Sequence, residues 1–122
     1  MQLNDLVEIL EKQIGSTLDY PFGDDVMVYK VMGKMYALIG ENDNPRRLNL
    51  KVDPIDAVAY RDIYENVIPG YHMNKKHWNT VYFDKDDSIP NEIIVDMIKD
   101  SYDLVRSKLT KKQKYELLAL SK

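Results

Sequence analysis

The 122-residue chain contains no cysteine, so disulfide bonds and metal sites held by thiolates are excluded. It also lacks any run of the roughly 18 apolar residues that a membrane-spanning helix needs. The first residues include Asn4, Asp5 and Glu8, where a secretory signal would be basic and then apolar. We therefore expect a cytoplasmic protein with no membrane partner.

Positive charge is not in excess. The net charge is -3 and the pI is about 5.3, whereas a dedicated DNA-binding domain typically has a pI above about 9. The charge is distributed unevenly: residues 1–25 carry one Lys against six Asp and Glu, residues 26–83 carry eight Lys and Arg against six, and residues 84–122 carry eight of each. A polyanionic partner would have to meet the middle of the chain.

Motifs for catalysis and metal binding are also lacking. The two histidines, His72 and His77, are five positions apart and have no serine, cysteine or carboxylate beside them in a motif. No glycine-rich phosphate loop, nucleophile elbow or zinc motif is present. Asp5, Glu8 and Glu11 suit the polar face of a helix better than a hard-metal site. We expect a non-enzymatic protein with no catalytic residues, no cofactor and no bound metal.

The hydrophobic pattern predicts alternating groups of helices and strands. The predicted elements are a helix over 3–14 ended by Gly15, a linker over 16–25, strands over 26–31 and 34–39 joined at Met32-Gly33, a strand over 48–52, a helix capped by Asp53, a strand over 78–83, a helix capped by Asn91, and a last helix with a capping box from Thr110 to Gln113. This order indicates an α+β fold, with a central antiparallel sheet, an N-terminal helix, a short middle helix and two C-terminal helices in a single domain over 1–122.

Apolar residues at helical spacing predict which helix faces are buried. The expected buried positions are Ile55, Val58 and Ala59 in the middle helix, Ile94, Ile98, Ser101, Tyr102 and Val105 in the long helix, and Tyr115 and Leu118 in the last helix.

The most informative segment spans residues 68–83. It contains both histidines, the single tryptophan, two adjacent lysines and further aromatic residues. Pro69-Gly70 marks a turn, and the aromatic and β-branched run that starts at Trp78 marks a strand. A basic, aromatic loop therefore leads into the sheet, and loops held by a rigid scaffold commonly carry binding residues.

Two sets of candidate site residues follow from this segment and from the strand predicted over 48–52, where Arg47, Asn49 and Lys51 alternate with the apolar residues and point to one face. Hypothetical nucleic-acid contacts are Arg46, Arg47, Lys51, Lys75, Lys76 and His77. A possible pocket comprises Tyr71, His72, Trp78 and Tyr82. Two structural interpretations stand beside these: the lysines are solvated loop charges, and Trp78 is a buried anchor covered by loop residues such as Tyr71. The Lys108, Lys111, Lys112 and Lys114 cluster could bind phosphate, but we favour the interpretation that it is the solvated start of the last helix.

Several segments resemble the MmcQ/YjbR-like family of small bacterial proteins. They are Tyr20-Pro21-Phe22-Gly23-Asp24-Asp25, Lys30-Val31, Gly33-Lys34-Met35, Leu48-Asn49-Leu50-Lys51-Val52-Asp53-Pro54, the run Asn74–Tyr82, and Ser101-Tyr102-Asp103-Leu104-Val105. The resemblance implies a frataxin/CyaY-like fold and DNA binding through a "double wing" of β-hairpins. The alternative is a protein- or small-molecule-binding module without a nucleic-acid role. We expect a monomer in either case.

Overall fold

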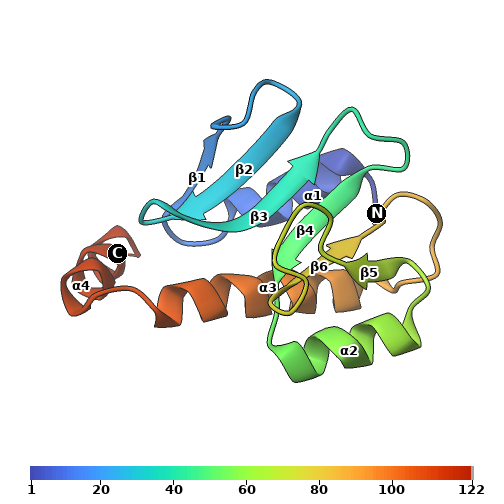
Figure 1. Cartoon of the computed structure of the whole chain (residues 1–122). Coiled ribbons are helices and arrows are strands. Elements are labelled where there is room, and N and C mark those ends of the chain that lie inside the picture. Colours follow the sequence, from blue (N-terminus) through green and yellow to red (C-terminus); the bar gives the residue numbers. More distant parts are fainter. Residues whose placement is uncertain (122) are drawn as a thin grey trace.

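Within residues 1–121, which the computed structural model describes, a six-stranded antiparallel sheet and four helices form the molecule (Figure 1). In chain order the elements are α1 (Leu3–Glu11), β1 (Ser16–Asp19), β2 (Val26–Val31), β3 (Lys34–Gly40), β4 (Arg47–Lys51), α2 (Pro54–Ile63), β5 (Val67–Pro69), β6 (Trp78–Val81), α3 (Asn91–Ser107) and α4 (Lys111–Leu120). The strands lie side by side in the order β1-β2-β3-β4-β6-β5. The α+β class predicted from the sequence is confirmed.

The hairpin between β2 and β3 turns where the sequence predicted. Met32 and Gly33 both have positive φ, at 49° and 80°, and this conformation matches the right-handed twist of the flanking strands. Glycine adopts it at no steric cost, which explains Gly33 at the second position.

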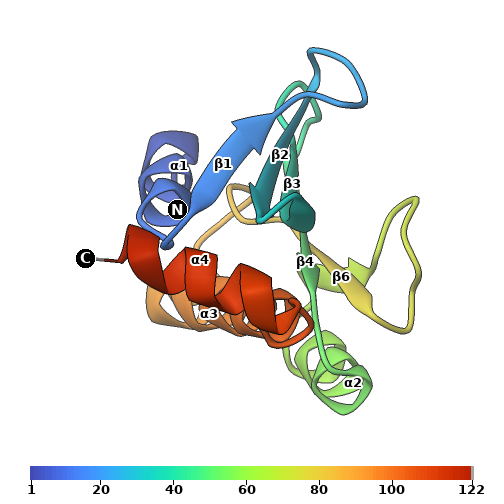
Figure 2. The same cartoon turned by 90° about the vertical axis from the view of Figure 1, so that its left-hand side faces the viewer.

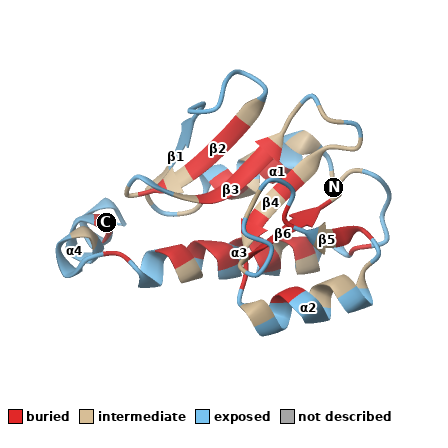
Figure 3. Ribbon diagram, viewed as in Figure 1, coloured by how far each residue is buried: buried red, intermediate tan, exposed pale blue. Residues whose placement is uncertain are grey.

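One face of the sheet carries the main core. Figure 2 shows α1, α3 and α4 together on this inner side. Strand alternation turns residues such as Tyr29, Ile39 and Leu50 toward α3. The α3 stripe predicted from the sequence is buried, and the burial colours of Figure 3 follow it along the side of α3 that faces the sheet.

A smaller apolar cluster covers part of the outer face. It consists of Val28, Leu38 and Trp78, with Met73 of the β5–β6 connection packed against it. Trp78 is 9% exposed, so its predicted burial is confirmed. The predicted cover was wrong in one detail: Tyr71 is 45% exposed, and Met73 is the loop residue that packs on the cluster.

The structure corrects several predicted boundaries. Residues 16–19, predicted as part of a linker, form β1 and pair with β2. The first helix ends at Glu11, so Ile14 lies beyond it and is 46% exposed. The strand predicted over 78–83 ends at Val81, although Phe83 is fully buried. The short β5, which the sequence left open, completes the sheet edge.

Two helices bury little of their predicted stripes. In α2 the buried residue is Ala57, whereas Ile55 and Val58 are exposed. In α4 the buried residue is Leu117, and the expected Tyr115 and Leu118 face outward. Both helices pack at the margin of the molecule (Figure 3). Besides its one buried residue, α2 contacts the main core through the half-buried Tyr60.

Helix starts are set by side-chain caps where the sequence shows one. The Asp53 carboxylate accepts the Ile55 N–H at 2.9 Å, and Thr110 and Gln113 form the predicted capping box. The prediction for α3 was wrong by one residue, because Pro90 occupies the N-cap and Asn91 is already helical. Among the residues described, no helix has the length and apolar character needed to cross a membrane.

Candidate functional site

The connection between β5 and β6, residues 70–77, stands away from the outer face of the sheet (Figure 2). From 66 to 83 the chain contains no Asp or Glu, but it contains both histidines, Lys75 and Lys76. This hairpin is therefore a locally cationic projection on an acidic protein.

Hydrogen bonds fix both ends of this connection. The Gly70 N–H donates to the Trp78 carbonyl at 2.9 Å, and the Lys75 ammonium donates to the Gly70 carbonyl at 3.1 Å. At the other end, the His77 carbonyl accepts the Val52 N–H at 2.8 Å. A Cβ at position 70 would lie 2.8 Å from the Trp78 Cβ, so only glycine lets the two segments approach this closely.

The second half of the connection borders a hollow of about 380 Å³ at the end of β4. We call this the basic hollow, defined by Lys51, Asn74, His77, Trp78 and Lys108. Lys51 lies in β4, His77 lies in the connection, and Lys108 directly follows α3. The one carboxylate on its wall, Asp53, is engaged as the α2 cap. Three cationic or titratable side chains from distant segments thus converge on one recess.

The first half of the connection borders a second hollow, of about 420 Å³, on the outer face of the sheet. We call this the outer hollow, defined by Phe22, Asp43, Arg47, Asn49, Tyr71 and His72. The rings of Phe22 and Tyr71 are 62% and 45% exposed. The single connection 70–77 therefore lines both hollows.

Arg47 occupies a fixed position in the outer hollow. Its guanidinium pairs with the Asp43 carboxylate at 2.9 Å and lies 4.2 Å from the centroid of the Tyr71 ring. Burial alone would lower the pKa of Arg47, but hydrogen bonds from the guanidinium to Tyr82 and Asp43 outweigh that effect and raise it. The side chain stays charged, and the adjacent carboxylate neutralises much of its field.

A short hydrogen-bond chain orients the polar wall of the outer hollow. The Tyr71 N–H donates to the Thr80 hydroxyl at 2.8 Å, and that hydroxyl donates to the side-chain oxygen of Asn49. The amide oxygen of Asn49 is therefore engaged with Thr80, which leaves the NH₂ group as the donor that this side chain can offer.

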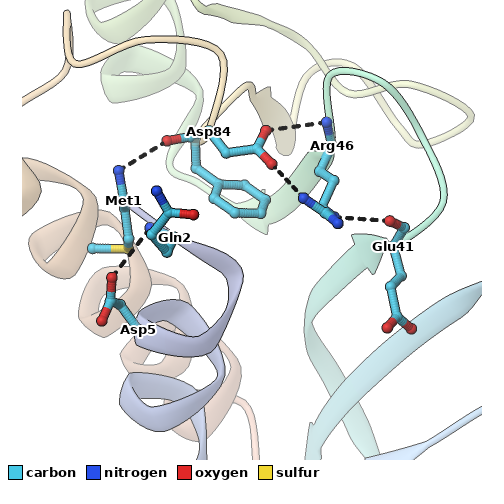
Figure 4. A network of polar contacts seen from close by, with 7 residues as sticks. Met1, Gln2, Asp5, Glu41, Arg46 and Asp84 are labelled. Atoms are coloured by element: carbon cyan, nitrogen blue, oxygen red, sulfur yellow. Dashed lines mark hydrogen bonds and ion pairs between the residues drawn. The ribbon is translucent and has the colours of Figure 1, made fainter.

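Arg46 lies apart from both hollows. Its guanidinium pairs with the Asp84 carboxylate at 2.9 Å and donates to the Glu41 carbonyl at 2.9 Å (Figure 4). Its backbone N–H donates a further hydrogen bond to the Asp84 carboxylate. The same region holds the N-terminal ammonium of Met1, which donates to the Phe83 carbonyl at 3.3 Å. Arg46 thus serves to tie the β3–β4 connection to the segment after β6.

Apart from Arg46, most of the predicted site residues lie at one of the two hollows. Lys51 and His77 share the basic hollow, and Lys75 and Lys76 are exposed on the connection above it. Arg47, Tyr71 and His72 share the outer hollow. Trp78 lies on the wall of the basic hollow, but most of its surface is in the outer-face cluster. Tyr82 is half-buried and contacts Arg47.

Five residues that define the hollows were not predicted as site residues: Phe22, Asp43, Asn49, Asn74 and Lys108. Lys108 belongs to a lysine run that the sequence pattern places at the start of the last helix, and only the tertiary structure brings it beside Lys51. Phe22 follows Pro21 in a turn-rich segment, and an exposed aromatic residue in such a turn is the signal that could have identified it.

The two histidines lie in different hollows, His72 in the outer hollow and His77 in the basic hollow. His72 has a positive φ of 58° and its ring lies 4.0 Å from the Tyr71 ring. Within residues 1–121, no group of three or more His, Cys, Asp or Glu side chains is placed to hold a metal ion.

An acidic groove borders the basic hollow on its other side. Asp56, Asp100 and Asp103 line a recess of about 350 Å³ between α2, α3 and β4, and Lys51 stands at its border. Burial raises the pKa of Asp100, and the nearby carboxylates raise it further. The α2–α3 side of the basic hollow is thereby acidic.

Comparison with known proteins gives consistent matches. A family model described as YjbR matches residues 12–104. The uncharacterized protein YbdF of Escherichia coli O157:H7 is 40% identical over 95 residues, which cover 78% of this chain and 76% of that protein. The uncharacterized protein YjbR of Escherichia coli K12 is 36% identical over 73 residues, which cover 60% of each chain.

Solved structures show the same fold. The crystal structure of Deinococcus radiodurans protein DR2400 superposes with a TM-score of 0.84 at 37% identity, covering 95% of this chain and 87% of that one. A crystal structure of a protein from Pseudomonas syringae superposes with a TM-score of 0.72 at 28% identity, covering 86% of this chain and 99% of that one.

Proposed function

Because the chain belongs to the YjbR family, we propose that it is a nucleic-acid-binding protein and not an enzyme, and that its phosphate contacts lie at the basic hollow. The observation that carries this proposal is the convergence of Lys51, His77 and Lys108 from three separate segments on one recess. Phosphate binding requires cationic donors that converge in this way. The exposed Lys76 extends the same surface along the connection.

The charge distribution supports a small contact area. With a net charge of -3, the molecule repels a polyanion at a distance, so attraction has to come from the acid-free hairpin over 66–83. A surface with about three lysines neutralises about three phosphates, which gives modest affinity with a clear salt dependence.

The test is a paired charge substitution. Lys51→Gln with Lys108→Gln should weaken binding to a labelled 12-nucleotide DNA, single-stranded or duplex, by about tenfold at low salt, because two phosphate contacts are lost. The matched control is Lys34→Gln with Lys85→Gln, which removes the same charge from exposed positions outside the two hollows. Equal weakening by both pairs would show that only net charge matters and would remove the basic hollow as the site.

The aromatic lining of the outer hollow favours a second candidate function. Phe22 and Tyr71 line this hollow of about 420 Å³, and small-molecule sites are lined mainly by apolar and aromatic side chains with a few polar groups. A module that binds a small molecule or a protein there, without nucleic acid, would show no DNA binding even at low salt. That result would reject the first proposal in favour of this one.

A further inference from the structure

We propose that the outer hollow receives one unpaired nucleobase of a single strand whose phosphates lie against the basic hollow. This inference rests on the nucleic-acid binding proposed above and names the form of nucleic acid that the same surface selects. It follows from the aromatic rings, the charge balance and the polar wall of the outer hollow, and from the one connection that joins both hollows.

The aromatic rings give the outer hollow a stacking surface. Phe22 projects from the β1–β2 connection and Tyr71 from the β5–β6 connection, and both line the hollow while staying largely exposed. Every nucleobase has a face that stacks on aromatic rings of this kind. The Arg47 guanidinium lies over the Tyr71 ring and the His72 ring lies 4.0 Å from it, so these neighbours hold Tyr71 in place.

The charge balance of the outer hollow favours a neutral group. Asp43 pairs with Arg47 inside the hollow, so a phosphate there would meet a carboxylate beside its only guanidinium. The basic hollow has the opposite character, since the Asp53 carboxylate is held by the α2 N-terminus and Lys51 and Lys108 are without an ion-pair partner among residues 1–121. The outer hollow is thus suited to a base of the strand, and the basic hollow to phosphate groups of the same strand.

The polar wall offers donors for a base edge. The Thr80 hydroxyl donates to the side-chain oxygen of Asn49, and Asn49 lines the hollow. With its oxygen engaged, an Asn side chain offers its NH₂ group as a donor, which suits a carbonyl oxygen, and thymine carries two of these. The first half of the connection, Tyr71–Met73, lines this hollow and the second half lines the basic hollow, so adjacent parts of one strand can reach both.

A base in a duplex cannot enter this recess without leaving its stack, which costs a few kcal/mol. A single strand meets no such cost. The expected order of affinity is therefore thymidine dodecamer (dT12) first, a 12-base-pair duplex next, and a 12-unit abasic deoxyribose-phosphate strand about equal to the duplex, because the last two offer phosphates alone.

The experiment measures binding of these three probes to the wild-type chain and to Tyr71→Ala and Phe22→Ala. Each variant should bind dT12 roughly 5- to 150-fold more weakly than the wild type, the loss expected for one stacked base. Neither should bind the abasic strand differently. Tyr71→Phe keeps the ring and should retain the affinity for dT12. Tyr115→Ala, which removes a similarly exposed tyrosine from α4, is the matched control and should change nothing.

Thymidine 5′-monophosphate separates a strand from a free nucleotide. It should bind at least about tenfold more weakly than dT12, since only the strand reaches both hollows. Equal affinity for dT12, duplex and abasic strand would overturn the base site while leaving phosphate binding intact. Equal affinity for the monophosphate and dT12 would overturn strand binding. A lack of binding by all four probes at low salt would reject the inference together with the proposed function.

Discussion

Trp78 lies in the outer-face cluster against Val28 and Leu38 and is 9% exposed. We predict that Trp78→Ala lowers the free energy of unfolding by about 3–5 kcal/mol, because a large buried ring is replaced by a cavity. Urea denaturation would measure this loss. In the wild type, the emission of this single tryptophan should be blue-shifted and resist iodide quenching. A red-shifted emission that responds to DNA would instead make Trp78 a stacking residue.

Tyr29 and Tyr36 are both buried, but their hydroxyl groups differ. The Tyr36 hydroxyl bonds to Ser16 at 2.6 Å and donates to the Leu10 carbonyl at 3.0 Å, whereas the Tyr29 hydroxyl has no hydrogen-bond partner within residues 1–121. Tyr36→Phe should therefore lower the free energy of unfolding by about 1–3 kcal/mol. Tyr29→Phe should leave it unchanged or raise it. A loss of stability in Tyr29→Phe that matches the loss in Tyr36→Phe would contradict this assignment.

The same tyrosines determine the response to alkaline pH. Burial raises the pKa of Tyr29 to about 12, from an ordinary value near 10, and burial raises the pKa of Tyr36 as well. Between these values the unfolded chain releases the proton and the folded protein keeps it. The free energy of unfolding should then fall as the pH rises from about 10 to about 12. Tyr29→Phe should make this fall shallower, which denaturation at several pH values would show.

At the scale of the elements, one buried serine adds two hydrogen bonds to the apolar packing of α3 on the sheet. The Ser101 hydroxyl donates to the Tyr36 carbonyl at 2.6 Å and accepts the Lys51 N–H at 2.9 Å, so it joins α3 to β3 and β4. Ser101→Ala should cost about 1–3 kcal/mol, because two buried backbone groups lose their partner. Ser107→Ala, in the exposed last turn of the same helix, is the control. Equal and small effects of both changes in thermal unfolding would refute the anchoring role.

Elements with a strong local signal could be predicted from the sequence. The Met32-Gly33 turn, the Asp53 cap and the α3 stripe are local features, and each is where the pattern places it. The strand β1 could not be predicted, because most of its residues are exposed and it is defined only by pairing with β2. The exposure of α2 and α4 could not be predicted either. Their apolar residues have helical spacing, but this spacing does not reveal that a helix lies at the margin of the molecule.

At the scale of the whole molecule, the candidate site was predicted only in part. The segment 68–83 stood out because its unusual residues are adjacent in sequence, and it does contribute to both hollows. Lys108 and Phe22 lie beside this segment only because of the tertiary fold. Arg46, which was predicted as a site residue, instead forms an ion pair with Asp84 away from both hollows. DNA binding, the double wing, the monomeric state and the cytoplasmic location stay predictions.

The central claim is that phosphates bind at the basic hollow, and the salt dependence of dT12 binding tests it most directly. With about three lysine contacts, log affinity against log salt should have a slope near -2 for a single strand, at about -0.7 per phosphate. Lys51→Gln with Lys108→Gln should reduce its magnitude by about 1.4, whereas Lys34→Gln with Lys85→Gln should leave it unchanged. No binding at low salt, or a slope that the first pair does not alter, would contradict the claim.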